Sequence, residues 1–318
     1  MIQDIKPHKL NNHFDPEASP DKDSIILFYT DAGILCHIAE KNGVPVVRLP
    51  ILKEFFSFSD SLCKTDRKEE SATAETPDDR LIYAFSLDSR KFFLFMPTCS
   101  VEERIAEKPE DALKDFSFCR VRELRAMKAG TQPTMFAIMT GLHLFHWYRK
   151  NRYCGCCGRP LVHDERERAL RCPSCGNMIY PRICPAVIVG VLNGDRILVT
   201  KYRTGFPHYA LVAGFTEIGE TLEETVIREV MEETGLHVKN IRYYKSQPWG
   251  IADDLLAGFY CEVDGSDTIH MDEQELKLAE WKTRDEIELQ PDDMSLTNEM
   301  MEQFKNGGII SLSKRQLP

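Results

Sequence analysis

The sequence predicts a mixed α/β protein in three parts, and three observations support this prediction. Residues 1–150 contain short strand-like apolar runs and one helical segment. Residues 151–180 hold two paired-cysteine motifs, and residues 181–318 hold further strand-like runs around a glutamate-rich helical segment. A chain of 318 residues is long enough for two hydrophobic cores, so we expect these parts to form separate domains.

The composition is that of an ordinary soluble globular protein, with 42% apolar and 28% charged residues. No apolar run approaches the roughly 18 residues of a membrane-spanning helix, and the polar first residues do not resemble a secretory signal. Eleven cysteines, an odd number with five of them between residues 154 and 175, do not resemble a secreted disulfide framework. We therefore expect a cytoplasmic protein without membrane partners.

The net charge of −10 argues against broad attraction to nucleic acid or to an anionic membrane. A local basic run is an exception and could form a small contact patch. This run comprises Arg149, Lys150 and Arg152, with Arg159 beyond it.

The first 150 residues predict strands, one loop and one helix. The segment 64–80 is charged and nearly free of apolar residues, which predicts an exposed or disordered loop. A helix is expected over about 133–149, and its mixed apolar surface predicts burial against another domain or subunit. The strand-like runs lie at 24–29, 44–49, 81–86 and 91–96.

The paired cysteines follow the spacing C-x2-C-x14-C-x2-C and comprise Cys154, Cys157, Cys172 and Cys175. Each C-x2-C turn can direct two thiolates at one ion, and two such turns complete the tetrahedral site of a structural zinc ion. Cys156 is spare because it follows Cys154 too closely. A redox pair is the alternative interpretation. Residues 158–171 predict a short β-hairpin, and hence a zinc ribbon that stabilises the fold.

The last part of the chain predicts a sheet closed by a helix. The turn sequence Asn193-Gly194-Asp195 joins two strand-like runs and predicts a hairpin. Residues 272–281 fit a loop and a strand near the far edge of the sheet, and residues 296–304 predict the closing helix. The other expected strands lie at 186–192, 196–202, 209–215, 238–244 and 255–263.

The most informative segment is the glutamate-rich stretch from Gly214 to Leu236. Read as a helix over about 221–234, it places Glu229, Glu232 and Glu233 within one narrow arc beside an apolar face. Carboxylates this close repel one another unless a cation lies among them, and oxygen ligands suit Mg²⁺ or Mn²⁺. The alternative is an acidic, solvated helix face.

This stretch fills every fixed position of G-x5-E-x7-R-E-U-x-E-E-x-G-U, where U is apolar, and so resembles the Nudix box. The resemblance implies a loop–helix–loop on an α/β/α sandwich that cleaves a nucleoside diphosphate linked to another group. Glu220 and Arg228 point away from the carboxylate arc, and we expect them to form an ion pair that fixes the helix to its preceding loop.

A zinc ribbon ahead of such a domain, together with Ser246-Gln247-Pro248-Trp249, resembles the NADH pyrophosphatase family. The resemblance covers the ribbon and the whole Nudix domain. It implies cleavage of NADH or NAD⁺ to nicotinamide mononucleotide and AMP, and some members also remove an NAD cap from RNA. It further suggests a homodimer.

The same resemblance implies site residues. Mg²⁺ or Mn²⁺ would be held by the Ala213 carbonyl, Glu229, Glu233 and Glu275, with Glu232 in the same cluster. These ions would bridge the pyrophosphate and activate a water molecule, and one of the carboxylates would accept its proton. The implied substrate-binding residues are Tyr180, Phe215, Gln247, Pro248, Trp249, Gly250, Ile251, Ala252, Asp253, Asp254 and Thr297.

One departure from the family keeps other functions open. After Trp249 the chain has Gly250 to Asp254 where the family has Pro-Phe-Pro-x-Ser. Asp254 thus replaces a hydroxyl with a carboxylate. Alternatives are a Nudix enzyme for ADP-ribose or diadenosine compounds, and a non-catalytic Nudix-fold sensor that binds a nucleotide and regulates a partner.

Overall fold

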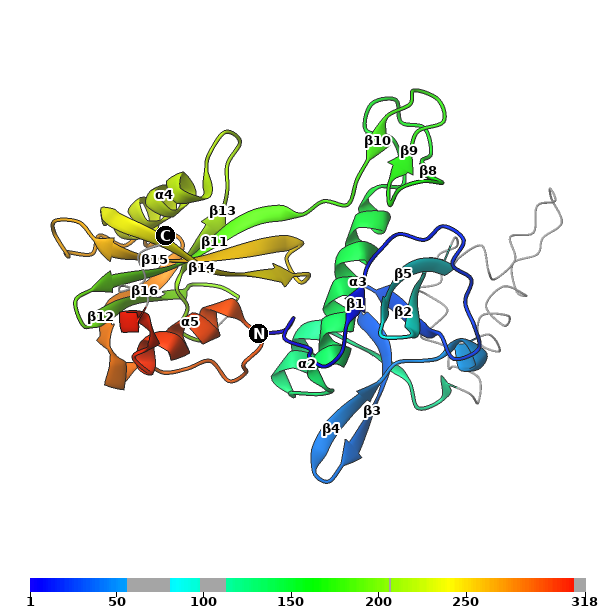
Figure 1. The fold of residues 1–318 in the computed structure, drawn as a ribbon, viewed down its shortest axis with the longest axis horizontal. Coiled ribbons are helices and arrows are strands. Elements are labelled where there is room, and N and C mark those ends of the chain that lie inside the picture. The colour runs from blue at the N-terminus through cyan, green and yellow to red at the C-terminus, as the bar shows by residue number, and fades with distance from the viewer. Residues whose placement is uncertain (56–80, 98–112, 206, 312–318) are drawn as a thin grey trace. The chain divides into compact units, whose positions relative to one another are not determined.

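The chain was analysed as a computed structural model that describes residues 1–55, 81–97, 113–205 and 207–311 (Figure 1). It forms two units. The N-terminal unit comprises Asp4–Arg182 with Gly250–Ala252, and the C-terminal unit comprises Met1–Gln3, Ile183–Trp249 and Asp253–Pro318. The division into three domains at residues 150 and 180 stays a prediction, and the loop predicted over 64–80 lies outside the described residues.

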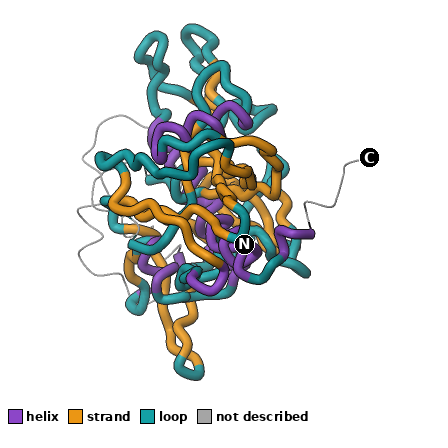
Figure 2. Tube along the Cα trace, turned by 90° about the vertical axis from the view of Figure 1, so that its left-hand side faces the viewer, coloured by secondary structure: helices purple, strands orange, loops and turns teal. Residues whose placement is uncertain are grey.

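The N-terminal unit is built on a sheet whose strand order is β1-β5-β6-β2-β3-β4, with β7 paired to β3. Strands β2 and β6 are parallel neighbours, and the β3–β4 hairpin extends from the sheet as a two-stranded ribbon (Figures 1 and 2). The four predicted strands are confirmed, whereas β1, β3 and β7 were not predicted. The strands are β1 Leu10–Asn11, β2 Ile25–Thr30, β3 Gly33–Lys41, β4 Val44–Arg48, β5 Leu81–Leu87, β6 Arg90–Phe95 and β7 Ser117–Cys119.

Two helices, α2 Val121–Ala126 and α3 Gln132–Lys150, follow this sheet. The predicted helix is therefore confirmed as α3, and it packs on the sheet of its own unit. The Tyr29 hydroxyl donates to the Ile138 carbonyl at 2.6 Å, and the Tyr29 ring stacks on Phe145. Among the described residues, no helix is long and apolar enough to cross a membrane.

The cysteine-rich segment forms a three-stranded sheet of β8 Val162–His163, β9 Leu170–Arg171 and β10 Met178–Ile179. The predicted hairpin is confirmed by the antiparallel β8–β9 pair, and β10 adds a strand that was not predicted. Arg168 joins this sheet to the larger one, because its guanidinium donates to the Ala84 carbonyl at 2.6 Å.

The C-terminal unit contains a sheet with the order β14-β15-β11-β12-β16, and β13 pairs with β11. The predicted hairpin at residues 193–195 is confirmed by the antiparallel β11–β12 pair, while β11 and β15 are parallel. The strand predicted over 209–215 begins later, and the one over 238–244 extends further. The strands are β11 Cys184–Asn193, β12 Arg196–Tyr202, β13 Val212–Phe215, β14 Val238–Trp249, β15 Asp254–Val263 and β16 Leu276–Thr283.

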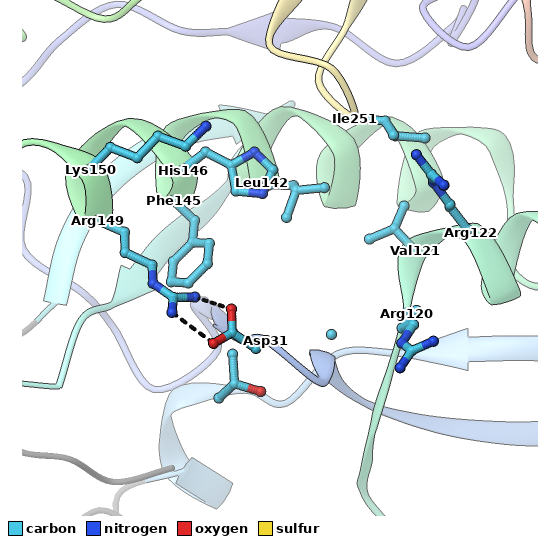
Figure 3. A pocket seen from close by; sticks show the side chains of 12 residues that line it. Asp31, Arg120, Val121, Arg122, Leu142, Phe145, His146, Arg149, Lys150 and Ile251 are labelled. Atoms are coloured by element: carbon cyan, nitrogen blue, oxygen red, sulfur yellow. Dashed lines mark hydrogen bonds and ion pairs between the residues drawn. The ribbon is translucent and has the colours of Figure 1, made fainter. Parts of the chain in front are cut away.

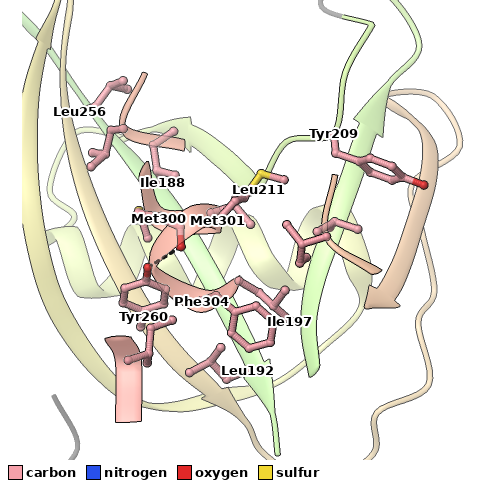
Figure 4. Close-up of a cluster of buried hydrophobic side chains, with 14 of the residues drawn as sticks. Ile188, Leu192, Ile197, Tyr209, Leu211, Leu256, Tyr260, Met300, Met301 and Phe304 are labelled. Atoms are coloured by element: carbon pink, nitrogen blue, oxygen red, sulfur yellow. Dashed lines mark hydrogen bonds between the residues drawn. The ribbon is translucent and has the colours of Figure 1, made fainter. Parts of the chain in front are cut away.

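Helices α4 Leu222–Thr234 and α5 Leu296–Lys305 cover opposite faces of this sheet. The alternation of β11 explains the layering: Val187 and Val189 pack with α4 in one core, while Ile188 packs with α5 in the other. In the second core the Tyr260 hydroxyl donates to the Met300 carbonyl (Figure 4). The predicted α/β/α sandwich is confirmed. Two short 3₁₀ turns complete the unit, Arg284–Glu286 and Gly308–Ser311.

Candidate active site

Helix α4 begins in a reciprocal capping arrangement. The Thr221 hydroxyl accepts from the Glu224 backbone N–H at 3.2 Å, and the Glu224 carboxylate accepts from the Thr221 N–H at 2.7 Å. These bonds satisfy two of the backbone donors that the first turn of a helix leaves without partners. Val226 and Val230, fully buried on one side of the helix, hold it on the sheet. The helix therefore presents its glutamates at a fixed position over the sheet.

Arg228 ties the helix to the loop before it. Its guanidinium binds both oxygens of Glu220, at 2.6 and 2.9 Å, and donates to the Phe215 carbonyl at 2.8 Å. These hydrogen bonds hold the pKa of Glu220 at about 2, well below its usual value. The ion pair expected from the sequence is therefore confirmed. Arg228 also contacts Glu229 at 2.7 Å and Glu232 at 3.0 Å.

The Glu229 carboxylate lies directly against the Cα atom of Gly214. A side-chain carbon placed on Gly214 would lie 1.9 Å from Glu229 Cδ, so any residue other than glycine would displace this carboxylate. Glu229 is 13% exposed, and burial raises its pKa while Arg228 opposes that rise. The carboxylate of Glu229, fifteen residues later in the chain, therefore explains the glycine at the start of the motif, because it occupies the space where a side chain would lie.

Glu233 is the most buried carboxylate of the helix, with 2% of the residue exposed. Its Oε2 atom has no hydrogen-bond partner among the described residues. Burial, followed by the negative charges of Glu229 and Glu275, raises its pKa to about 8. A buried carboxylate oxygen without a donor is costly unless a cation or a proton lies beside it.

Glu275 comes from a different segment and is positioned by backbone hydrogen bonds. The loop before it is bound to the end of α4, because the Asp272 N–H donates to the Glu233 carbonyl at 2.9 Å. Its own carbonyl accepts from the Arg203 N–H at 3.0 Å, which attaches it to the end of β12. Glu275 is therefore held where its charge raises the pKa of both Glu229 and Glu233.

These carboxylates have the chemistry of a divalent-metal site. The charges of Glu232 and Glu275 both raise the pKa of Glu229, and the charges of Glu229 and Glu275 raise that of Glu233, while Glu232 itself is 60% exposed. Among the described residues they do not bring three ligand atoms within 4.8 Å of one another. Nevertheless the oxygen-only donor set and the partnerless Glu233 oxygen fit Mg²⁺ or Mn²⁺, which would offset the repulsion. The acidic segment is thus a partly buried cluster rather than a solvated helix face.

A second group of ligands is already assembled in the zinc ribbon. The sulfur atoms of the four predicted cysteines all lie within 4.8 Å of one another. Cys154 and Cys175 are 3.6 Å apart and Cys157 and Cys172 are 3.5 Å apart, close to the ~3.8 Å that tetrahedral Zn–S bonds require. Cys157, rather than Cys156, completes the set, as predicted. The residues fit a structural zinc ion.

The two cysteine turns of the ribbon repeat one geometry. The Gly158 N–H donates to the Cys154 carbonyl at 2.8 Å, and the Gly176 N–H donates to the Cys172 carbonyl at 2.9 Å. Both glycines adopt positive φ angles, 70° and 76°, that favour glycine. A backbone hydrogen bond from Cys156 lowers the pKa of Cys154 to about 6, which favours the metal-binding thiolate.

Comparison with known proteins agrees with both sites. Residues 182–304 match the NUDIX domain family model, and residues 149–180 match the NADH pyrophosphatase zinc ribbon domain. These residues therefore match a Nudix domain that follows an NADH pyrophosphatase zinc ribbon domain. The box carboxylates lie in the first match, and all four cysteines lie in the second.

Named relatives cover part of the chain. It is 39% identical over 165 residues to the NAD-capped RNA hydrolase NudC of Escherichia coli O9:H4, which covers 51% of this chain and 63% of that protein. A protein of the same name from Shigella boydii serotype 18 matches equally. The chain thus spans less than two thirds of the length of these relatives. The crystal structure of a NUDIX hydrolase from Nitrosomonas europaea matches 50% of this chain with a TM-score of 0.44 and 19% identity.

The two aromatic residues expected to flank a substrate ring are both exposed. Tyr180, which follows β10 of the ribbon, is 53% exposed, and Phe215, at the end of β13 in the Nudix domain, is 52% exposed. Exposed rings of this size are available to stack on a flat base. Their role in binding substrate stays a prediction.

The segment from Gln247 to Asp254 is divided by the structure. The Gln247 side chain is fully buried, where it accepts from the Leu296 N–H at 2.7 Å and donates to the Met294 carbonyl at 2.8 Å, so it fixes the start of α5. Asp254 is buried, its Oδ1 has no partner among the described residues, and burial raises its pKa to about 7. Pro248 and Trp249 end β14, whereas Gly250, Ile251 and Ala252 belong to the N-terminal unit. Asp253 precedes β15, and Thr297 lies in the first turn of α5.

Tyr202 is a residue of this site that the sequence did not reveal. It ends β12, where the pairing with β16 shifts register. Burial and the charges of Glu233, Glu275 and Glu229, in that order, raise its pKa, so its hydroxyl stays protonated beside the carboxylates. Periodicity placed Tyr202 in a strand but could not show that this strand ends at the Nudix helix.

Proposed function

We propose that the protein is a metal-dependent hydrolase that cleaves the pyrophosphate of NAD⁺ or NADH to nicotinamide mononucleotide and AMP. The observation that carries this proposal is the buried Glu233 carboxylate, whose Oε2 atom has no hydrogen-bond partner among the described residues, beside Glu229 and Glu275 in a complete Nudix box. The zinc ribbon of the NADH pyrophosphatase type supports NAD as the substrate. The name of the 39% identical relatives supports removal of NAD caps from RNA as a further activity.

The chain's own residues divide the task of the reaction. Mg²⁺ or Mn²⁺, when bound, supplies neutralisation of the pyrophosphate charge and a more acidic water molecule. Glu229, Glu233 and Glu275 would hold the metal, while Arg228 holds Glu229 through a 2.7 Å contact and anchors the helix through Glu220. Tyr180 and Phe215 would contact the rings of the dinucleotide.

Comparison of substrates tests the proposal most directly. The purified chain would be incubated with Mg²⁺ or Mn²⁺ and with NAD⁺, NADH, ADP-ribose or NAD-capped RNA, and kcat/KM compared. AMP and nicotinamide mononucleotide are the expected products from NAD⁺ and NADH. Absence of hydrolysis of every substrate, in a protein that retains its zinc, would contradict an enzymatic function and favour a nucleotide sensor.

Substitution of Glu229 separates chemistry from folding. Glu229→Gln should lower kcat by about two to three orders of magnitude, the scale on which loss of a charge-stabilising group acts. Glu223→Gln is the matched control, because Glu223 is exposed on the same helix and lies outside the cluster. Both variants should keep the melting temperature of the parent. Full activity of Glu229→Gln would contradict the proposed mechanism.

A second candidate is hydrolysis of another dinucleotide, such as ADP-ribose or a diadenosine compound. The observation that favours it is the sequence Gly250 to Asp254, which lacks the prolines and aromatic residue of the NADH pyrophosphatase tract. A kcat/KM for ADP-ribose above that for NAD⁺ and NADH would select this candidate.

The cytoplasmic location and the homodimer also belong to the proposal. The clustered cysteines of the zinc-ribbon type support a reducing compartment. Light scattering on the purified protein would test the dimer, since a mass near that of one 36.5 kDa chain would contradict it.

A further inference from the structure

A hollow of about 540 Å³ opens in the N-terminal unit, and none of its lining residues belongs to the four-cysteine set or to the Nudix carboxylates (Figure 3). It lies between α2, the second half of α3 and the turn that joins β2 to β3. Its apolar lining includes Val121, Leu142 and Phe145. Its volume falls within the roughly 300–1,000 Å³ of small-molecule sites.

The lining of this hollow is strongly basic. Among the described residues that form it, the cations are Arg120 and Arg122 around the start of α2 and Arg149 and Lys150 at the end of α3, and the one carboxylate is Asp31. With His146 neutral, the lining carries a formal charge of +3, whereas the whole chain carries −10. The hollow therefore concentrates positive charge on an acidic protein.

The arginines at the two ends of the hollow differ in their contacts. Arg149 is fixed by a two-pronged ion pair with Asp31, at 2.5 and 2.7 Å (Figure 3). The guanidinium of Arg122 is exposed, and it makes no hydrogen bond or ion pair with any residue that the structure describes. Its donors are thus available to phosphate oxygens, which match the planar guanidinium geometry.

We propose that this hollow binds a small phosphorylated anion of nucleotide size. Its phosphate would lie among the arginines, and its uncharged part would lie against Leu142 and the neighbouring apolar side chains. A small ligand is favoured over RNA because the charges line a concave space rather than an extended groove, and because the net charge of the chain repels a long polyanion. The hollow contains none of the proposed metal ligands, but Ile251, one of the residues predicted to bind substrate, also lines it.

Calorimetric titration of the full chain with AMP, ATP or inorganic phosphate, without added Mg²⁺ or Mn²⁺, tests the proposal. In Arg120→Ala/Arg122→Ala the affinity should fall by about tenfold or more, since each charge-assisted hydrogen bond contributes that much. Arg90→Ala/Arg166→Ala is the matched control, because it removes two exposed arginines of the same unit outside the hollow. Leu142→Trp, which fills the space without changing charge, should also weaken binding. Melting curves verify that each variant folds.

Each outcome decides the proposal. Binding that depends on Arg120, Arg122 and Leu142 supports it, and the ratio of AMP to phosphate affinity tells a nucleotide from free phosphate. Equal affinity in the two double variants overturns it, as does the absence of binding by the parent. Tighter, Arg122-dependent binding of a short single-stranded RNA than of ATP would overturn the small ligand in favour of nucleic acid.

Discussion

The four-cysteine centre and the carboxylate centre are assembled in different ways. In the ribbon, two short turns that repeat one hydrogen-bond pattern bring four sulfur atoms within 4.8 Å of one another. In the Nudix domain, Glu229 and Glu233 come from one helix and Glu275 from a distant loop, and their oxygens are not gathered so closely. The thiols form a closed ligand set, whereas the carboxylate oxygens are more widely spaced.

This difference shows how each ion would contribute. A closed set of four soft ligands uses the whole coordination sphere of zinc, so the ion stabilises the fold. In an open set of carboxylates with raised pKa values, a cation reduces the repulsion between the carboxylates. Because the set is open, that ion can also contact a reacting group. Loss of ligands should therefore reduce stability in the first centre and catalysis in the second.

The largest expected effect is on the zinc centre. Cys172→Ser should abolish zinc binding and unfold the ribbon, because zinc supplies about 10 kcal/mol or more of folding free energy in comparable small domains. Zinc content and the melting curve are the measurements. Cys156→Ser is the control, since Cys156 lies outside the sulfur cluster, and it should keep one zinc ion per chain. A melting curve for Cys172→Ser identical to that of the parent would contradict a stabilising role for zinc.

The next effect tests the carboxylate centre through a glycine. Gly214→Ala should lower kcat by about 10- to 100-fold, because the added carbon displaces the flexible end of Glu229 by an ångström or more. Stability should change little, since a side-chain end moves rather than backbone. Gly155→Ala in the ribbon, with nothing within 4 Å of the added carbon, serves as the control and should change neither property.

A pH series tests whether repulsion among the buried carboxylates lowers the stability of the folded protein. Because the fold raises the pKa of Glu233 from 4.5 to about 8, the folded state keeps a proton that the unfolded state releases. The stability of the protein without added divalent metal should therefore fall as pH rises from about 4.5 to 8, by about 2–4 kcal/mol. Glu233→Gln should reduce this slope in urea denaturation by the contribution of Glu233, while Asp254, whose pKa burial raises to about 7, should keep its own contribution. The same dependence of unfolding free energy on pH in parent and variant would show that Glu233 does not destabilise the folded state at high pH.

The smallest effect concerns the start of the Nudix helix. Thr221→Ala removes the hydroxyl that caps α4 and should cost about 1 kcal/mol of stability. Activity should stay within about threefold of the parent, because Arg228 still anchors the helix to Glu220. Thr131→Ala, at the start of α3, is the matched control, and a larger fall in activity there than in Thr221→Ala would argue against this division of roles.

Local patterns in the sequence predicted much of the fold and both metal centres. The box residues predicted the helix and the Glu220–Arg228 pair, because these interactions join residues less than three helical turns apart, whereas the Thr221–Glu224 cap was not predicted. The cysteine spacing specified the sulfur set for the same reason. Strands with strongly apolar runs were predicted, whereas β3, whose second half is charged, and the short strands β1 and β7 were not.

The tertiary structure decided what depends on contacts between distant segments. Only the folded sheet places Tyr202 and Glu275 beside the Nudix helix and uses the Gln247 amide to fix α5. It also buries Glu233 so that its Oε2 atom has no donor among the described residues. Likewise it collects Arg120, Arg122 and Arg149 around one hollow. The sequence by itself determined which chemical groups are present at helical or turn spacing. The pKa of a buried carboxylate and the charge of a cavity depend on burial and on residues far apart in the chain coming close together. Both exist only once the core has formed.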